Sequence, residues 1–164
     1  MMRGVDSPSF TAVFEHGVHV VNASGIVGAT PQQIVEAHTQ RDKASVFRDI
    51  GHYTHFGQEA DGSVRVAFPA RIGFFRFPQM FHKRVINQGA GRRIEFTTPP
   101  GAIAEVKGAW DLIPINTDRT MVSFNQTATV PSWAKFLPVD GYIKSRVTRM
   151  MEDLAAINTP KPQE

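Results

Sequence analysis

One segment near the C-terminus constrains this chain more than any other: PVDGYIKSRVTRMMEDLAAI, residues 138–157. Its apolar side chains recur every three or four residues, which places them on one stripe of an amphipathic helix, broadened by Met151: Ile143, Val147, Met150, Leu154 and Ile157. Pro138 suits the first turn of a helix because its missing N–H needs no partner there. Such a helix is about 28 Å long, so we expect an apolar surface of similar length to cover the stripe.

The chain before this helix predicts mainly β-strands. A long first strand is expected over 13–27, irregular near Gly17 and Gly25. Alternating apolar and polar residues then predict about six antiparallel strands, separated by turn signals such as Asp61-Gly62: 52–58, 64–68, 74–87, 94–96, 102–112 and 122–128. Short hairpin connections favour a meander over a parallel sheet. The natural solution is one sheet curved around one helix.

Two short helices are expected between the first strand and the later ones. Thr30 is a good N-cap, Pro31 fits the first helical position, and Gln33 completes a capping box. This helix should end near His38. Asp42 is expected to cap a second helix over 43–48, with its apolar side chains facing inward.

The composition is that of an ordinary globular domain, with 164 residues of which 41% are hydrophobic and 20% charged. We expect one domain over 10–158, with flexible ends at 1–9 and 159–164. The absence of cysteine excludes disulfides and thiol chemistry and fits a cytoplasmic protein. No apolar run approaches the roughly 20 residues that span a bilayer, so no transmembrane segment is predicted.

The element order resembles the START-like, or SRPBCC, superfamily, and most of all its polyketide cyclase/dehydrase and lipid-transport branch. Three stretches carry the likeness: SGIVGATPQQIVEA (24–37), GAWDLIPINTDRTMVSF (108–124) and the closing helix after Pro138. The resemblance covers nearly the whole chain, from about residue 18 to 157. It implies an α+β helix-grip fold: a curved antiparallel sheet wrapped around a long C-terminal helix, with two short helices after the first strand. It also implies an apolar cavity between sheet and helix. The superfamily has no universal catalytic signature, so the resemblance assigns no catalytic residue to this chain.

The inner faces of the predicted strands and helix supply the candidate lining of this cavity. Trp110 and Phe124 should face the helix, Lys107 and Asp111 should face solvent, and the small Ala104 and Gly108 should leave space between the larger side chains. The full candidate ligand-binding set is mostly apolar: Phe68, Phe81, Phe96, Val106, Trp110, Phe124, Gln126, Ile143, Arg146, Val147 and Met150.

Two members of this set are polar, and each has a plain alternative. The amide of Gln126 would bind a ligand carbonyl or hydroxyl, or else bond a neighbouring side chain. The guanidinium of Arg146 would reach a ligand oxygen at the cavity mouth, or else extend over the surface.

The histidines do not predict a metal site. His16 and His19, like His52 and His55, are three apart, so on a strand they point to opposite faces and cannot chelate together. We predict no metal and no cofactor. Either His55 or His82 would serve as a single acid or base, although a lone histidine is more often structural.

A group of basic residues lies on neighbouring predicted strands: Arg71, Arg76, Lys83, Arg84, Arg92 and Arg93. The simplest interpretation is the solvated face of a sheet. The functional alternative is contact with RNA or with acidic lipid headgroups, which the formal charge of +3 permits. Gly89-Ala90-Gly91 lies in a hairpin and is a turn, not a dinucleotide-binding loop.

Three functions remain open from the sequence. The first is a carrier or receptor for an apolar small molecule such as a lipid, an isoprenoid or an aromatic polyketide. The second is an enzyme that cyclises or dehydrates a polyketide-like substrate in the same cavity. The third, weaker one is a ribosome- or protein-interaction module. The expected partner is an apolar ligand or substrate, with no DNA, and peripheral membrane contact stays open, as does the oligomeric state.

Overall fold

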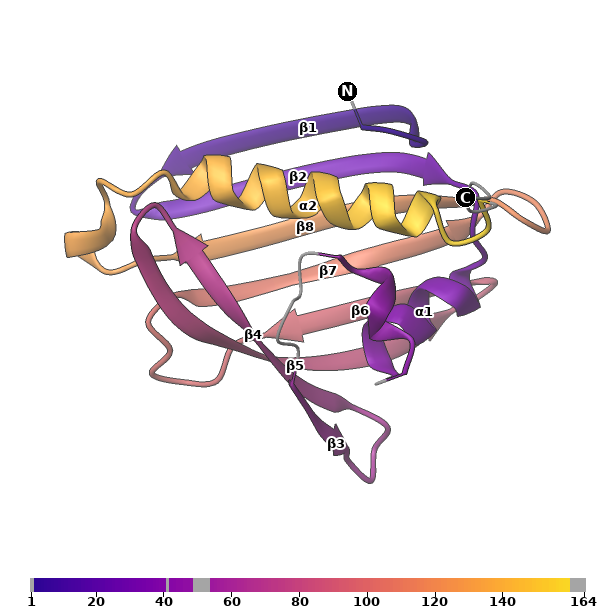
Figure 1. The fold of residues 1–164 in the computed structure, drawn as a ribbon, viewed down its shortest axis with the longest axis horizontal. Coiled ribbons are helices and arrows are strands. Elements are labelled where there is room, and N and C mark those ends of the chain that lie inside the picture. Colours follow the sequence, from indigo (N-terminus) through magenta and orange to yellow (C-terminus); the bar gives the residue numbers. More distant parts are fainter. Residues whose placement is uncertain (1, 41, 49–53, 160–164) are drawn as a thin grey trace, which may run out of the picture.

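The computed structural model describes residues 2–40, 42–48 and 54–159, which form one antiparallel sheet and a long C-terminal helix (Figure 1). The strands are β1 (Asp6–Glu15), β2 (Val18–Val27), β3 (Thr54–Gln58), β4 (Val64–Ile72), β5 (Phe75–Gln88), β6 (Gly91–Thr97), β7 (Glu105–Pro114) and β8 (Thr120–Thr129). Within this part of the chain their order in the sheet is β1-β2-β8-β7-β6-β5-β4-β3. Strands β3 to β8 are a meander, and β8 pairs with β2.

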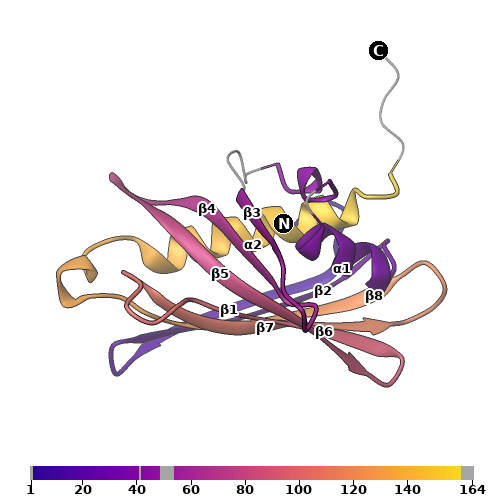
Figure 2. The ribbon, with the colours of Figure 1, turned by 90° about the horizontal axis from the view of Figure 1, so that it is seen from below.

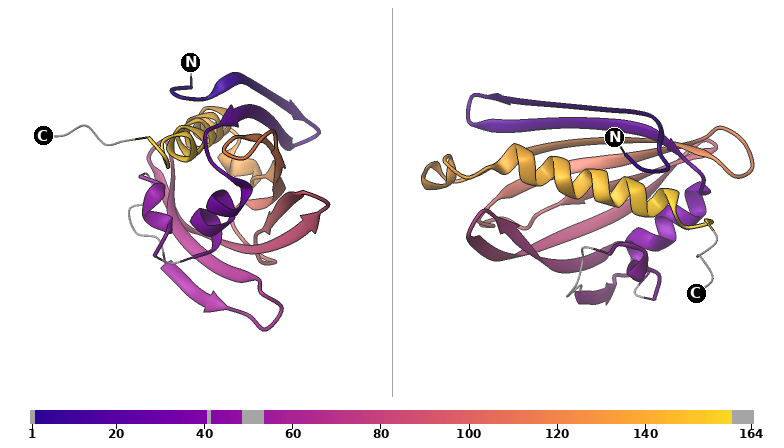
Figure 3. Two further views of the ribbon diagram at one scale, coloured as in Figure 1. Left: turned by 90° about the vertical axis from the view of Figure 1, so that its right-hand side faces the viewer. Right: turned by 45° about the horizontal axis from the view of Figure 1, so that its top comes forward.

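The sheet curves around the helix α2 (Val139–Ala155), as Figures 2 and 3 show. The predicted helix and helix-grip architecture are therefore confirmed. The buried stripe of α2 includes Ile143, Val147 and Leu154 as expected, but Met151 is fully buried whereas Met150 is only half-buried. Gly25 of β2 permits close packing, because a Cβ there would lie 2.3 Å from Cγ1 of Val5 and 3.1 Å from Cε of Met151. The irregularity expected near Gly25 is also present, because the register of β1 on β2 shifts between Asp6 and Ser9, opposite this glycine, whereas β2 pairs with β8 without a shift.

The N-terminal part differs from the sequence-based expectation. The segment predicted as one long strand is a hairpin of β1 and β2, turned at His16 and Gly17, both with positive φ. The strand β1 begins at Asp6, and Met2 and Val5 are buried, although 1–9 were expected to be loose. Strand β1 could not be recognised from the sequence, because nearly all of its side chains are exposed and it therefore has no clear apolar alternation.

The connection from β2 to β3 carries the first predicted helix and a shorter turn. The helix α1 (Pro31–Thr39) has the predicted capping box, in which the Gln33 N–H donates to Thr30 Oγ1 at 3.1 Å and the Thr30 N–H donates to Gln33 Oε1 at 3.0 Å. The second helix is a 3₁₀ turn, η1 (Ala44–Val46), without a side-chain cap, so the predicted cap by Asp42 is wrong. Both follow β2, which ends at Val27, where the strand predicted over 13–27 was expected to end. Part of the strand predicted over 52–58 lies outside the described residues.

The register of the central strands matches the prediction. Trp110 of β7 lies opposite Ile94 of β6 and Phe124 of β8, and all three are buried beneath the helices. Lys107 is exposed on the opposite face, and Asp111 is half-buried there. The hydrophobic core therefore fills the concave side of the sheet, which is where α1 and α2 lie.

Candidate functional site

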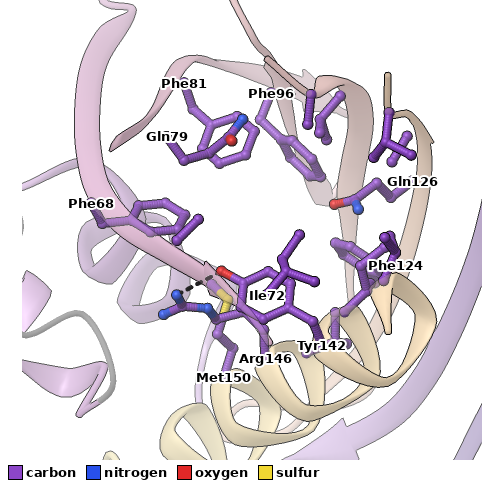
Figure 4. Close-up of a pocket in the computed structure, with 18 of the residues that line it drawn as sticks. Phe68, Ile72, Gln79, Phe81, Phe96, Phe124, Gln126, Tyr142, Arg146 and Met150 are labelled. Carbon is purple, nitrogen blue, oxygen red and sulfur yellow. Dashed lines mark hydrogen bonds between the residues drawn. The ribbon is translucent and has the colours of Figure 1, made fainter. Parts of the chain in front are cut away.

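A cavity of about 100 Å³ lies between the concave face of the sheet and the first two-thirds of α2 (Figure 4). The structure places every residue of the candidate set on its lining. Further lining residues were not in that set: Ala70, Ile72, Phe77, Gln79, Lys83, Ala104, Ala128, Val130, Val139 and Tyr142. The geometry brings the candidate residues together, and their role in binding a ligand stays a prediction.

The wall of the cavity is a ladder of aromatic rings from neighbouring strands, called here the ring ladder. It is made of Phe68, Phe81, Phe96, Phe124 and Trp110, whose successive ring centroids lie 5.5, 5.5, 5.8 and 4.7 Å apart. These rings occupy much of the concave side and leave a small space. An engineered cavity of about 150 Å³ holds benzene, so the space found here suits a single ring or a short chain.

Of the two small residues expected to leave space in the cavity, Ala104 and Gly108, only the first lies on its lining. Gly108 does not leave a void, because a Cβ there would lie 2.2 Å from the backbone oxygen of Asn125 and 2.7 Å from Cζ of Phe96. This glycine lets the Phe96 ring and the β8 backbone come close to β7, so it is a packing residue.

Arg146 bridges the helix and the sheet at one side of the cavity (Figure 4). Its Nη2 donates to the hydroxyl of Tyr142 at 2.9 Å and to the carbonyl oxygen of Pro69 at 3.3 Å. Its guanidinium lies 4.8 Å from the centre of the Phe68 ring, within the range of a cation–π contact. Arg146 therefore joins α2 to β4 as part of the cavity wall, and its contact with a ligand stays a prediction.

Two amides reach this cavity. Gln126 on β8 is half-buried and points its side chain inward (Figure 4). Gln79 on β5 was missed, and its Nε2 is buried without a hydrogen-bond partner among the described residues. The alternation of Phe77, Gln79 and Phe81 would have placed it on the inner face.

Lys83 also lies on the inner face of β5, which corrects its assignment to a solvated basic face. Its side chain is buried, with 7% of the residue exposed, and Nζ lies 3.1 Å from Nδ1 of His38 on α1. Burial lowers the pKa of Lys83 to about 8. Burial and then the charge of Lys83 hold the pKa of His38 well below its usual value. At neutral pH the ammonium therefore donates to a neutral imidazole, whose Nε2 has no partner among the described residues.

The other members of the basic group lie outside the cavity lining. Arg93 pairs with Asp111 at 2.8 Å, and Arg84 pairs with Glu95 at 3.3 Å, so acidic neighbours offset part of this charge. Contact of this face with RNA or lipid headgroups stays a prediction.

Three of the histidines singled out in the sequence, His19, His55 and His82, have structural contacts, whereas His52 lies outside the described residues. His19 Nδ1 lies 2.7 Å from Oδ1 of Asp140 and links β2 to the first turn of α2, whereas His16 is in the hairpin turn. His55 Nε2 is 2.9 Å from the Thr39 carbonyl oxygen, and His82 Nε2 is 2.9 Å from Ser63 Oγ. None of these lines the cavity. Over 2–40, 42–48 and 54–159, no group of three or more potential metal ligands is found.

One end of the molecule exposes large aromatic side chains, called here the aromatic tip: Phe74, Trp133 and Phe136, which are 89%, 56% and 85% exposed. They come from the β4–β5 turn and from the segment around η2 (Ser132–Ala134). These segments lie side by side, because the rings of Phe75 and Trp133 are 5.0 Å apart. In the described part of the chain, no helix has the length and apolar character to cross a membrane.

Comparison with solved structures shows the fold. A STAR-related lipid transfer protein from Xanthomonas axonopodis has a TM-score of 0.62 at 13% identity and covers 88% of this chain and 98% of its own. The Zhui aromatase/cyclase from Streptomyces sp. R1128 has a TM-score of 0.65 at 12% identity, with 85% and 92% covered. Human StAR-related lipid transfer protein 5 has a TM-score of 0.62 at 12% identity, with 92% and 86% covered. No protein-family model and no curated protein matches the chain by sequence.

Proposed function

We propose that this chain, which has a START-like helix-grip fold, binds an apolar small molecule between its sheet and α2, as a carrier or receptor. The observation that supports this most is the space left between the ring ladder and the helix, lined almost entirely by apolar side chains. The ligand class is a lipid, an isoprenoid or an aromatic polyketide. The names of the structural neighbours from Xanthomonas axonopodis and human agree with the first of these.

A cavity-filling substitution tests this proposal. Ala104→Leu places a larger side chain on the lining, whereas Ala102→Leu is a matched control two residues away that is not on the lining. We expect the wild type and Ala102→Leu to bind the neutral dye Nile red and to carry a co-purifying apolar molecule in native mass spectrometry, and Ala104→Leu to lose both. Equal dye binding by a folded Ala104→Leu would show that the dye does not enter this cavity.

The alternative function is a cyclase or dehydratase that uses the same cavity, as the name of the Streptomyces neighbour suggests. The polar groups on the lining, Gln79, Lys83 and Gln126, support it, because a positioned amide or amine would orient a reacting carbonyl. Gln126→Leu separates the two functions. A carrier would keep its affinity for apolar ligands within a few fold, whereas an enzyme would lose turnover of a polyketide-like substrate and keep binding it.

Peripheral contact with a membrane fits the carrier function, and the aromatic tip supports it. Exposed Phe and Trp beside basic side chains favour the interface of an anionic bilayer, and Lys135 and Arg71 are exposed in the same two segments. Sedimentation with vesicles containing phosphatidylserine tests this. We expect Phe74→Ser/Phe136→Ser to lose binding and Phe56→Ser/Ile113→Ser, a control with two side chains each 56% exposed, to keep it. Equal binding of both variants would remove the aromatic tip from the proposal.

A further inference from the structure

We infer that the cavity accepts amphipathic carboxylic acids, whose carboxylate binds the ammonium of Lys83 and whose apolar body lies along the ring ladder. This assigns a ligand class to the proposed binding function and rests on that function. The charges and positions of the lining residues support this ligand class.

The first observation is the charge of the lining. Among the residues that the structure describes, the lining includes two cationic side chains, Lys83 and Arg146, and no aspartate or glutamate. Arg146 already donates hydrogen bonds to Tyr142 and Pro69 at the side of α2. A cavity with cationic groups, apolar walls and no acid favours a ligand that brings a negative charge.

The second observation is that Lys83 is buried without a counter-ion among the described residues. Its hydrogen-bond partner is the neutral His38, and no salt bridge of Lys83 is found in that part of the chain. A buried charge is costly unless an opposite charge compensates it. A carboxylate in the cavity would supply that charge and accept a charge-assisted hydrogen bond from Nζ.

The third observation is the sheet register beside Lys83. Lys83 lies opposite Phe96, Phe96 lies opposite Gly108, and Gly108 lies opposite Gln126, so the four form one row across the concave face. Because strands are about 4.8 Å apart, roughly 14 Å of backbone separates the polar ends of the row. The Phe96 ring packs over Gly108 and so provides a continuous apolar wall between these ends, against which the body of a ligand would lie.

The protonation state of Lys83 gives a test that needs no substitution. The titratable or charged side chains that face it or share its cavity are His38 from α1 and Tyr142 and Arg146 from α2. His38 is neutral at pH 7 because its pKa is well below the usual value. Since burial lowers the pKa of Lys83 to about 8, the empty protein loses this charge above pH 8, and the preference for a carboxylate should fall with it.

The experiment compares two single-ring probes of equal shape, benzoate and benzamide, by isothermal titration calorimetry, because the cavity suits one ring. We expect wild type at pH 7 to bind benzoate at least about tenfold more tightly than benzamide, since a hydrogen bond between charged groups contributes that much. Lys83→Met keeps a similar volume and removes the charge, and it should abolish the preference while retaining benzamide. Arg84→Gln removes one charge from the exposed neighbouring position and should retain the preference.

Each result has a separate meaning. Wild type that binds benzamide as well as benzoate at pH 7, or Lys83→Met that keeps the preference, overturns the inference and leaves apolar binding intact. Failure of wild type to bind either probe overturns the proposed function instead. If Lys83→Met does not fold, the wild-type pH profile decides: a preference that falls about tenfold per pH unit above 8 supports the inference, and a constant preference refutes it.

Discussion

Removing the amine of Lys83 should change how the stability of the empty protein depends on pH. Burial lowers the pKa of Lys83 from 10.5 to about 8. Between these values the unfolded chain binds a proton that the folded chain does not, so stability rises with pH. The free-energy cost of burying the charged Lys83 is fully present below pH 8 and is gone above pH 10.5. The difference of about 2.5 units, at about 1.36 kcal/mol per unit, corresponds to about 3 kcal/mol.

The measurement is urea unfolding of wild type and Lys83→Met at pH values from 7 to 10.5, followed by the fluorescence of Trp110 and Trp133. The free energy of unfolding of wild type should rise relative to the variant by about 3 kcal/mol across this range. Comparison with the variant removes the contribution of the other lysines and tyrosines. Parallel pH profiles would refute the reasoning, because they would mean that Lys83 keeps an ordinary pKa and has a compensating partner.

Four further substitutions test the fold and the cavity wall. Thr30→Ala removes the capping box of α1 and should cost about 1 kcal/mol of unfolding free energy in the same urea assay; no change would mean that α1 frays without cost. Gly108→Ala should cost about 1–3 kcal/mol because its Cβ meets the Asn125 backbone, whereas Gly141→Ala, in open space on α2, should gain about 1 kcal/mol; the opposite order would contradict the packing described. Arg146→Ala should speed Nile red association in stopped flow by loosening α2 from β4, and an unchanged rate would place the entrance elsewhere.

The parts of the fold that follow simple periodicity could be predicted from the sequence. The helix after Pro138, the cap at Thr30 and the inward side of β7 each follow from a local pattern that the tertiary structure leaves intact. The strand β1 could not be predicted, because its exposed side chains carry no alternation. The irregularity near Gly25 could be predicted, but the sequence does not show that Val5 and Met151 pack against this glycine.

The apolar part of the site was accessible to the same reasoning, and its polar part was not. Alternation placed the ring ladder on the inner face because large apolar side chains are rarely displayed in a row on a solvated face. Lys83 follows the same alternation as Phe81 and Phe77, which places it on the inner face. It was nevertheless predicted to be exposed, because charged side chains are usually exposed to solvent. Only the structure shows that His38 of α1 lies within 3.1 Å of this amine.

The size of the cavity bears on which function the molecule performs. About 100 Å³ suits one ring or a short chain, so a longer ligand requires α2 to move away from β4. The bond from Arg146 to the Pro69 carbonyl oxygen opposes this movement, whereas the bond to Tyr142 lies within α2 and moves with it. A typical hydrogen bond contributes only about 1 kcal/mol, so the apolar contacts of α2 with the sheet set most of the cost of opening. A carrier that loads and unloads requires this opening. A site that orients a substrate for cyclisation gains instead from staying closed, so the rate of opening at Arg146 separates a carrier from an enzyme.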